Sequence, residues 1–167
     1  MDVSNGRLRK VEKLRNNTTT YHWFVSNPIN NYGVNINIGS YTHFSEIFNG
    51  EKGKLQCDYY VLKDDLEKAR AQFRQAPMML AAFEYWMGPY PFYEDGYKLV
   101  QVPYLGMEHQ SSVTYGNGFK NGYAGRDLSV SGWGMKFDFI IIHESGHEWF
   151  ANSITYEDAA DMWVHES

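Results

Sequence analysis

The feature that most constrains this chain is the segment 143–147, which reads His-Glu-Ser-Gly-His and places two histidines four positions apart. Residues four apart lie one turn above each other on the same face of a helix, so we predict a helix here, at 135–151. The two imidazoles can then bind one zinc ion, which in a catalytic site keeps one position for water. On such a helix Glu144 is rotated about 100° from His143 and would accept a proton from that water.

A zinc site of this kind needs a third protein ligand, and Glu166 is the candidate. Eighteen residues separate it from His147. A second helix, which we expect to begin near Glu157, would bring it back to the metal. The chain has 6 His among its 167 residues, and at such a composition the four-residue pattern of His143, Glu144, His147 and Glu166 arises by chance on the order of 0.001 times. We therefore expect one Zn²⁺ per chain, held by His143, His147 and Glu166.

The remaining elements follow the order of an α+β protein rather than the regular alternation of a doubly wound sheet. Alternating and apolar patterns predict strands at 21–25, 34–38, 55–62 and 97–102, a long amphipathic helix at 66–87, and a glycine-rich loop at 116–134. Asp64-Asp65 would cap the long helix, Pro77 would kink it or divide it in two, and Gly88-Pro89 would end it. The basic stretch within 1–20 is typical of a solvated strand face.

Composition excludes several classes of protein. The net charge of -5 leaves no basic face for nucleic acid, and no apolar run approaches the length of about 18 residues that spans a membrane. A single cysteine, Cys57, excludes a disulfide framework within the chain. Residues 1–20 contain no apolar segment of a signal peptide, and the compartment stays undetermined.

The metal motif, with Glu166 eighteen residues after it, resembles that of the gluzincin metallopeptidases. Its surroundings narrow the resemblance to the aminopeptidase N-like family. The matching segments are His147–Asn152 (family form H-x-W-F-G-N), Asp161–Glu166 (D-x-W-L-N-E), Gly106–His109 (the end of G-A-M-E-N), Tyr90-Pro91-Phe92, Val102-Pro103, and Asn27-Pro28-Ile29 with Tyr32 and Ile38-Gly39. The resemblance covers most of residues 21–167.

For the fold, the resemblance implies an α+β, thermolysin-like zinc metallopeptidase catalytic domain, represented by its first half and preceded by the end of an N-terminal β-domain. Residues 1–40 would be the C-terminal remnant of that β-domain. Residues 41–167 would be the N-terminal half of the catalytic domain, truncated just after the third zinc ligand.

For function, the resemblance implies a zinc-dependent aminopeptidase that removes N-terminal residues from peptides. His143, His147 and Glu166 would be the zinc ligands and Glu144 the general base. Glu108 would bind the free α-amine of the substrate, so that cleavage falls one residue from the N-terminus. The other residues expected to bind substrate are Gly106, Met107 and His109.

The sequence departs from the family at three places near the site. Leu105-Gly106 stands where the family has Gly-Ala, and His109 stands where it has Asn, so the preferred first residue of the substrate is not predicted. His109 could also act as a fourth metal ligand, but we favour a role in lining the substrate cleft, as for its neighbour Gln110. Ala151 replaces a family Gly, which we interpret as a minor change.

The resemblance also implies missing parts. The family tyrosine that stabilises the oxyanion, and groups that orient the histidines, would lie beyond the chain end. Losing one oxyanion donor costs about 10²–10³ in rate, so we expect a chain with little or no peptidase activity. Core surface exposed by truncation would also favour self-association.

Three other readings stay open on sequence grounds. The chain could be a non-enzymatic scaffold or binding relative of the same fold, and epoxide hydrolysis occurs in one branch of the family. A carbohydrate-binding module is the third reading, because aromatic residues could stack on sugars. We interpret those aromatics instead as core packing; they are Tyr59, Tyr60, Trp86, Tyr90 and Tyr93.

Overall fold

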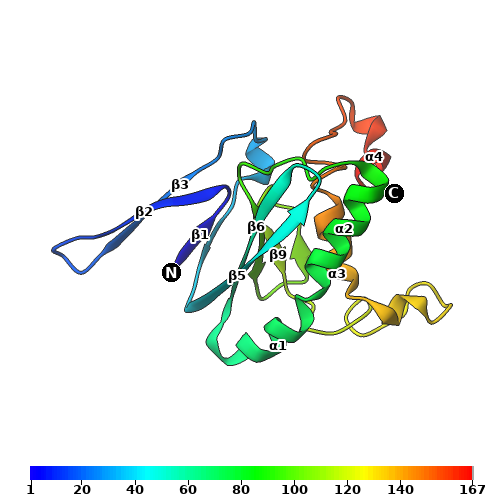
Figure 1. The fold of residues 1–167 in the computed structure, drawn as a ribbon, viewed down its shortest axis with the longest axis horizontal. Coiled ribbons are helices and arrows are strands. Elements are labelled where there is room, and N and C mark those ends of the chain that lie inside the picture. The colour runs from blue at the N-terminus through cyan, green and yellow to red at the C-terminus, as the bar shows by residue number, and fades with distance from the viewer. Residues whose placement is uncertain (167) are drawn as a thin grey trace.

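The computed structural model describes residues 1–166, and it has a mixed α+β fold built around a five-stranded sheet (Figure 1). In spatial order the strands are β5 (Tyr41–Gly50), β6 (Gly53–Leu62), β7 (Tyr97–Gln101), β9 (Val113–Tyr115) and β8 (Gly106–Met107). The α+β class predicted from the sequence is confirmed. The pairs β6–β7 and β7–β9 are parallel, whereas β5–β6 and β8–β9 are antiparallel. The short strand β8 is therefore an edge of the sheet.

Helices cover one face of this sheet. They are α1 (Leu66–Gln72), α2 (Gln75–Met87) and α3 (Phe139–Gly146). Elsewhere the chain forms the short helix α4 (Trp163–Glu166) and the 3₁₀ turns η1 (Asn31–Gly33), η2 (Lys63–Asp65), η3 (Trp133–Lys136) and η4 (Ala159–Asp161). The predicted helix at 66–87 is two helices end to end. The break falls before Pro77, because a proline in the first turn of α2 lacks an N–H that would have no helical partner there. Asp65 takes the capping position of α1 but makes no capping bond.

The helix predicted at 135–151 is much shorter than expected. It begins at Phe139 because the Asp138 side chain caps it, accepting hydrogen bonds from the N–H groups of Ile140 and Ile141 at 3.1 and 3.4 Å. Residues 133–136 form η3, and Phe137 lies outside the helix. The helix predicted from Glu157 is likewise reduced to the two short turns η4 and α4.

The main core lies between the sheet and the helices. Alternate residues of β6 point into it, and all are buried: Leu55, Cys57, Tyr59 and Val61. They pack against α1 and α2 through Ala69, Phe73, Ala76, Met79 and Leu80. This alternation is what a strand covered on one face by helices requires.

The opposite face of the sheet is covered by the N-terminal strands. Tyr60 and Val100 pack there against Val3, with Trp23 beside them. The strand β1 (Asp2–Ser4) pairs with β4 (Ile36–Ile38), and β2 (Arg7–Lys13) pairs with β3 (Thr19–Phe24) in a hairpin that extends from the body (Figure 1). The basic stretch forms β2, which is exposed over most of its length, as predicted.

The predicted strands are all present with shifted ends, whereas β1, β5, β8 and β9 were not predicted. The small N-terminal sheets end before residue 40, and the central sheet begins at Tyr41. The assignment of 1–40 and 41–167 to two family domains stays a prediction. Within residues 1–166, no helix has the length and apolar character needed to cross a membrane.

Candidate metal and peptide site

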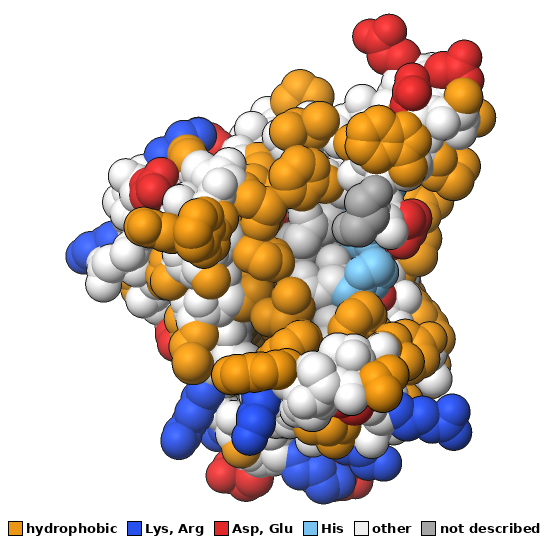
Figure 2. Space-filling view, turned by 90° about the vertical axis from the view of Figure 1, so that its right-hand side faces the viewer, with side chains coloured by type: hydrophobic (Ala, Val, Ile, Leu, Met, Phe, Trp, Pro, Cys, Tyr) orange, Lys and Arg blue, Asp and Glu red, His pale blue; other side chains and the backbone are white. Residues whose placement is uncertain are grey.

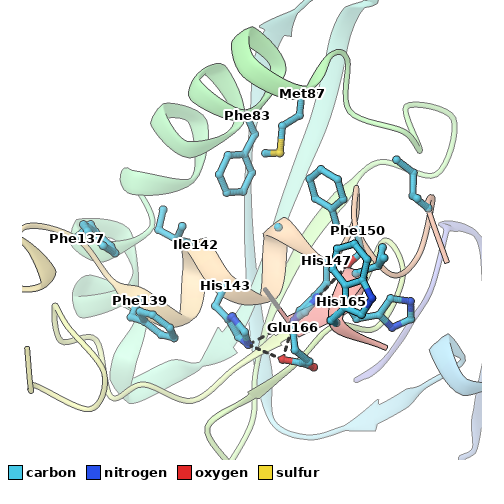
Figure 3. A pocket seen from close by; sticks show the side chains of 14 residues that line it. Phe83, Met87, Phe137, Phe139, Ile142, His143, His147, Phe150, His165 and Glu166 are labelled. Atoms are coloured by element: carbon cyan, nitrogen blue, oxygen red, sulfur yellow. Dashed lines mark hydrogen bonds and ion pairs between the residues drawn. The ribbon is translucent and has the colours of Figure 1, made fainter. Parts of the chain in front are cut away.

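The three predicted zinc ligands lie together. The Nε2 atoms of His143 and His147 are 3.4 Å apart, and Oε2 of Glu166 lies 3.8 Å from the first and 4.0 Å from the second (Figure 3). Donor atoms about 2.1 Å from a tetrahedral zinc are about 3.4 Å from one another. The three atoms therefore have the spacing that one zinc ion requires, with Glu166 slightly withdrawn.

The two histidines are positioned by the packing of α3. Ile140 and Ile141, on its inner face, are buried in the core. His147 is the residue that follows the last residue of the helix, and it keeps helical dihedral angles (φ −65°, ψ −15°). Because the helical path continues through it, its ring faces the same side as that of His143.

A hydrogen bond fixes the orientation of His147. Its Nδ1 lies 3.1 Å from the backbone oxygen of Phe150, which accepts a hydrogen bond when the ring carries its proton on Nδ1. The proton on Nδ1 leaves Nε2 free to bind a metal. The sequence predicted that groups orienting the histidines lie beyond the chain end, but this one lies three residues after the ligand.

The backbone at Ala151 corrects the prediction that this replacement of a family glycine is minor. Ala151 has φ = +147°, a backbone conformation in which glycine is favoured and other residues are strained. The replacement of a family glycine by Ala151 is therefore not a minor change. A backbone hydrogen bond closes this turn, because the Asn152 N–H donates to the His147 carbonyl at 2.9 Å.

Glu144 is buried beside the two histidines, with a carboxylate oxygen within 4.8 Å of a ring nitrogen of each. Burial raises its pKa to about 8, and the negative charges of Glu108 and Glu166 add to the effect. Gly106 on β8 makes room for it, because a Cβ there would lie 2.6 Å from Oε1 of Glu144. This contact explains why the edge strand carries glycine at that position.

The charges around the site favour a cation. Burial, and then the neighbouring His147, lower the pKa of His143, which keeps its imidazole neutral and able to bind a metal. Glu166 and Glu108 both act electrostatically on Glu144, so three carboxylates share this region. The described residues that line the adjoining cavity include no Lys or Arg. A divalent ion would offset this negative charge.

Glu108, the residue expected to bind the amine, is also buried. One of its carboxylate oxygens, Oε1, accepts a hydrogen bond from the Tyr32 hydroxyl at 2.9 Å. Its backbone oxygen accepts one from the Asn152 side chain at 2.8 Å. Glu108 is therefore held both by the N-terminal residues and by the turn that follows His147.

The other predicted substrate residues lie on either side of Glu108. Gly106 and Met107 form the edge strand β8, whose outer side is open. His109 is half-buried, and burial lowers its pKa. Among residues 1–166, the cluster of side chains close enough to share an ion contains His143, Glu144 and His147. Neither Glu166 nor His109 belongs to it, but Glu166 lies within 4.0 Å of both histidines, and no such contact is seen for His109. The geometry therefore gives no support to His109 as a fourth ligand.

A cavity of about 810 Å³ adjoins the predicted metal ligands on the side of α2. Its apolar lining includes Phe83, Met87, Phe139 and Phe150 (Figure 3). Figure 2 shows a histidine in a hollow bordered by hydrophobic side chains, with the Lys and Arg side chains of this face gathered away from it. The sequence did not identify this lining, since Phe83 and Met87 come from the helix 66–87, which was interpreted as core.

The aromatic residues weighed as a sugar site do not form one surface. Tyr59, Tyr60 and Tyr90 are buried, as core packing predicts. Trp86 is 79% exposed and packs edge-to-face on Tyr85, so for this residue the interpretation as core was wrong.

Comparison with known proteins finds an aminopeptidase of similar sequence. Human endoplasmic reticulum aminopeptidase 1 is 25% identical over 168 residues, which cover 98% of this chain and 17% of that protein. The predicted resemblance to aminopeptidase N-like zinc metallopeptidases is confirmed. No protein-family model matches the chain.

Solved structures show the same fold. An M1 zinc metallopeptidase from Deinococcus radiodurans superimposes with a TM-score of 0.72 at 18% identity, covering 99% of this chain and 34% of that one. Aminopeptidase A of Legionella pneumophila, in complex with aspartic acid, gives a TM-score of 0.82 at 17% identity, covering 99% and 20%. The chain thus has the fold of part of an M1 metallopeptidase and spans about a third or less of the length of each of these proteins.

Proposed function

We propose that this chain carries the zinc-binding and amine-binding side chains of an aminopeptidase that removes N-terminal residues from peptides. The observation that carries the proposal is the group of three donor atoms on His143, His147 and Glu166, spaced 3.4 to 4.0 Å apart. Buried Glu144 lies against that group. The similarity to zinc aminopeptidases along 98% of the chain supports the same reading.

The side chains have distinct roles in this proposal. Zinc bound by the three ligands would supply Lewis-acid activation of water and of the peptide carbonyl. Glu144 lies on α3 and its side chain rests against Gly106. Its carboxylate accepts the proton from water and returns it to the leaving amine. The hydrogen bond from His147 to Phe150 keeps Nε2 available to the metal.

Glu108 decides where the peptide is cut. A buried carboxylate pairs with the α-ammonium of the substrate, and an acetylated N-terminus offers no such charge. Substrates are therefore peptides with a free N-terminus, whose first residue lies beside Gly106, Met107 and His109. We further propose that the 167-residue chain turns over slowly, because the described residues offer no counterpart of the family's oxyanion tyrosine.

Self-association is a separate proposal. Large apolar side chains are exposed on the helical side, among them Met78 at 72% and Trp133 at 72%. Such surface favours association, which sedimentation at rising concentration would reveal as growing mass. A monomer at every concentration would contradict it.

The decisive experiment measures zinc per chain by elemental analysis after dialysis against trace zinc, for the wild type, His143→Ala and Glu144→Gln. We expect near one zinc in the wild type and in Glu144→Gln, and little in His143→Ala. His22→Ala, which alters an exposed histidine of the hairpin, is the control. A wild type that binds no zinc would support a non-enzymatic relative instead.

Turnover of an aminoacyl-anilide by the same proteins completes the test. We expect slow hydrolysis that Glu144→Gln abolishes while zinc stays bound. Hydrolysis that survives Glu144→Gln would show that another group is the base. Rapid hydrolysis by the wild type would contradict the expected low activity.

A further inference from the structure

Tyr32 extends from the N-terminal region toward the amine-binding carboxylate. It lies in the 3₁₀ turn η1, where the Asn30 side chain accepts a hydrogen bond from the Tyr32 N–H at 3.0 Å. A second bond of the turn joins the Gly33 N–H to the Asn30 carbonyl at 2.9 Å. The turn is therefore locally fixed, and it presents a side chain that is 59% exposed.

Asn5 fastens this turn to the loop that contains Glu108. Its buried side-chain amide donates to the Gly33 carbonyl at 2.8 Å and to the Gln110 carbonyl at 2.6 Å. In return, the Gln110 side chain donates to the Pro28 carbonyl at 2.9 Å. Two segments more than 70 residues apart in the sequence are thus held in one arrangement.

The Tyr32 hydroxyl contacts the Glu108 carboxylate. It donates to Oε1 at 2.9 Å, and within residues 1–166 no other side chain is seen to donate to that carboxylate. Burial and then the bond to Glu108 raise the pKa of Tyr32 to about 12, with smaller effects from Glu166 and Glu144. The hydroxyl consequently stays a donor at neutral pH, and it faces the carboxylates of the metal site.

We propose that Tyr32 is a positioning residue for the α-ammonium of the substrate. An ionised carboxylate has about four acceptor positions on its two oxygens, so a bond at Oε1 leaves Oε2 for the ammonium while it restricts rotation of the group. Selection of free N-termini would then depend on the N-terminal residues as well as on Glu108. This inference rests on the proposed function, specifically on amine binding by Glu108.

The test compares the binding of L-leucinamide and N-acetyl-L-leucinamide to the zinc-loaded chain by NMR titration. We expect Tyr32→Phe to weaken L-leucinamide about tenfold, a size typical of one hydrogen bond to a charged group, and to leave the acetylated compound unchanged. Tyr32→Gln, which restores an N–H donor, should recover part of the loss. Tyr85→Phe removes a hydroxyl from an exposed tyrosine on α2 and serves as the control.

Glu108→Gln separates failure of this inference from failure of the proposed function. If Glu108→Gln abolishes the preference for the free amine but Tyr32→Phe leaves it intact, the role of Tyr32 is overturned and the proposed function stands. Equal weakening of both compounds by Tyr32→Phe, or a lower zinc content, would show a merely structural role. If the wild type and Glu108→Gln both bind the two compounds equally, amine recognition fails and Tyr32 has no ammonium to position.

Discussion

The candidate metal site has two unlike sides. His143 lies in the eight-residue helix α3, which packs in the core, and His147 directly follows that helix; their side chains are 35% and 4% exposed. Glu166 comes from the four-residue helix α4, and its side chain is 57% exposed. The two histidines are thus held by packing against the core, whereas Glu166 lies in a short, exposed helical turn with little packing around it.

This difference teaches which ligands are preorganised. A ligand locked by its neighbours loses little conformational entropy when the metal binds, whereas an exposed glutamate loses more. The two histidines should therefore contribute most of the zinc affinity, and substitution of Glu166 should reduce that affinity less. The following predictions test this contrast.

The largest expected effect is on zinc affinity. His143→Ala should weaken zinc by about a thousandfold or more, because changes outside the ligand set already cost about 10–100-fold. Glu166→Ala should reduce zinc affinity clearly less than His143→Ala does, because the Glu166 carboxylate is solvated before the metal binds. Competition with a zinc indicator dye measures both. An equal loss in the two variants would break the contrast.

The next effect concerns Glu144 on the packed side. Its pKa in the folded chain, about 8, lies above the ordinary glutamate value of 4.5, so between these pH values the folded state holds a proton that the unfolded state has lost. In zinc-free protein the stability contributed by this group should be complete below about pH 4.5 and fall as the pH rises toward 8.

Urea unfolding with a chelator, at several pH values, measures this loss. Glu144→Gln should show less decline, by up to about 5 kcal/mol, because the pKa is raised from 4.5 to about 8 and each pKa unit corresponds to about 1.4 kcal/mol. Subtracting the unfolding free energies of the two proteins at each pH removes the contribution of the other titrating groups, which both proteins share. Parallel pH profiles would show that Glu144 ionises normally in the folded chain.

A smaller effect concerns the turn that links the packed ligands to the chain end. Ala151→Gly should stabilise the protein by about 1 kcal/mol, since glycine adopts φ = +147° without strain. Ala81→Gly, at an exposed position within α2, should destabilise it by up to about 1 kcal/mol. Thermal unfolding measures both, and changes of the same sign would contradict the assignment of strain.

The smallest effect is expected on the exposed side. His165 lies next to Glu166, and its Nε2 is 3.4 Å from Thr155 Oγ1 and 3.3 Å from the Tyr156 nitrogen. His165→Ala should change stability by less than about 1 kcal/mol, because water replaces these partners. Thermal unfolding is again the measurement, and a loss comparable with that of a core substitution would show that the chain end is packed more firmly than its exposure indicates.

Local patterns predicted the elements they encode. The apolar spacing at 66–87 marked α1 and α2, and the alternation at 55–62 marked β6, because packing against one neighbour imposes a period on the sequence. The strand β5 was missed because its paired residues are largely exposed and leave no apolar period. The start of α3 was also missed, although its cap is local: Asp138 stands directly before the apolar run and accepts from Ile140 and Ile141, a helix-start signal that the sequence carries.

By itself the sequence determined the chemistry of this protein: two histidines one helical turn apart, a glutamate between them, and an ordered set of segments that resembles one family. These follow from spacing along a single chain. Tertiary structure decided what spacing does not encode. It set the distance of Glu166 from the histidines, the strain at Ala151 and the contact of Tyr32 with Glu108, because each depends on how separate segments pack against one another.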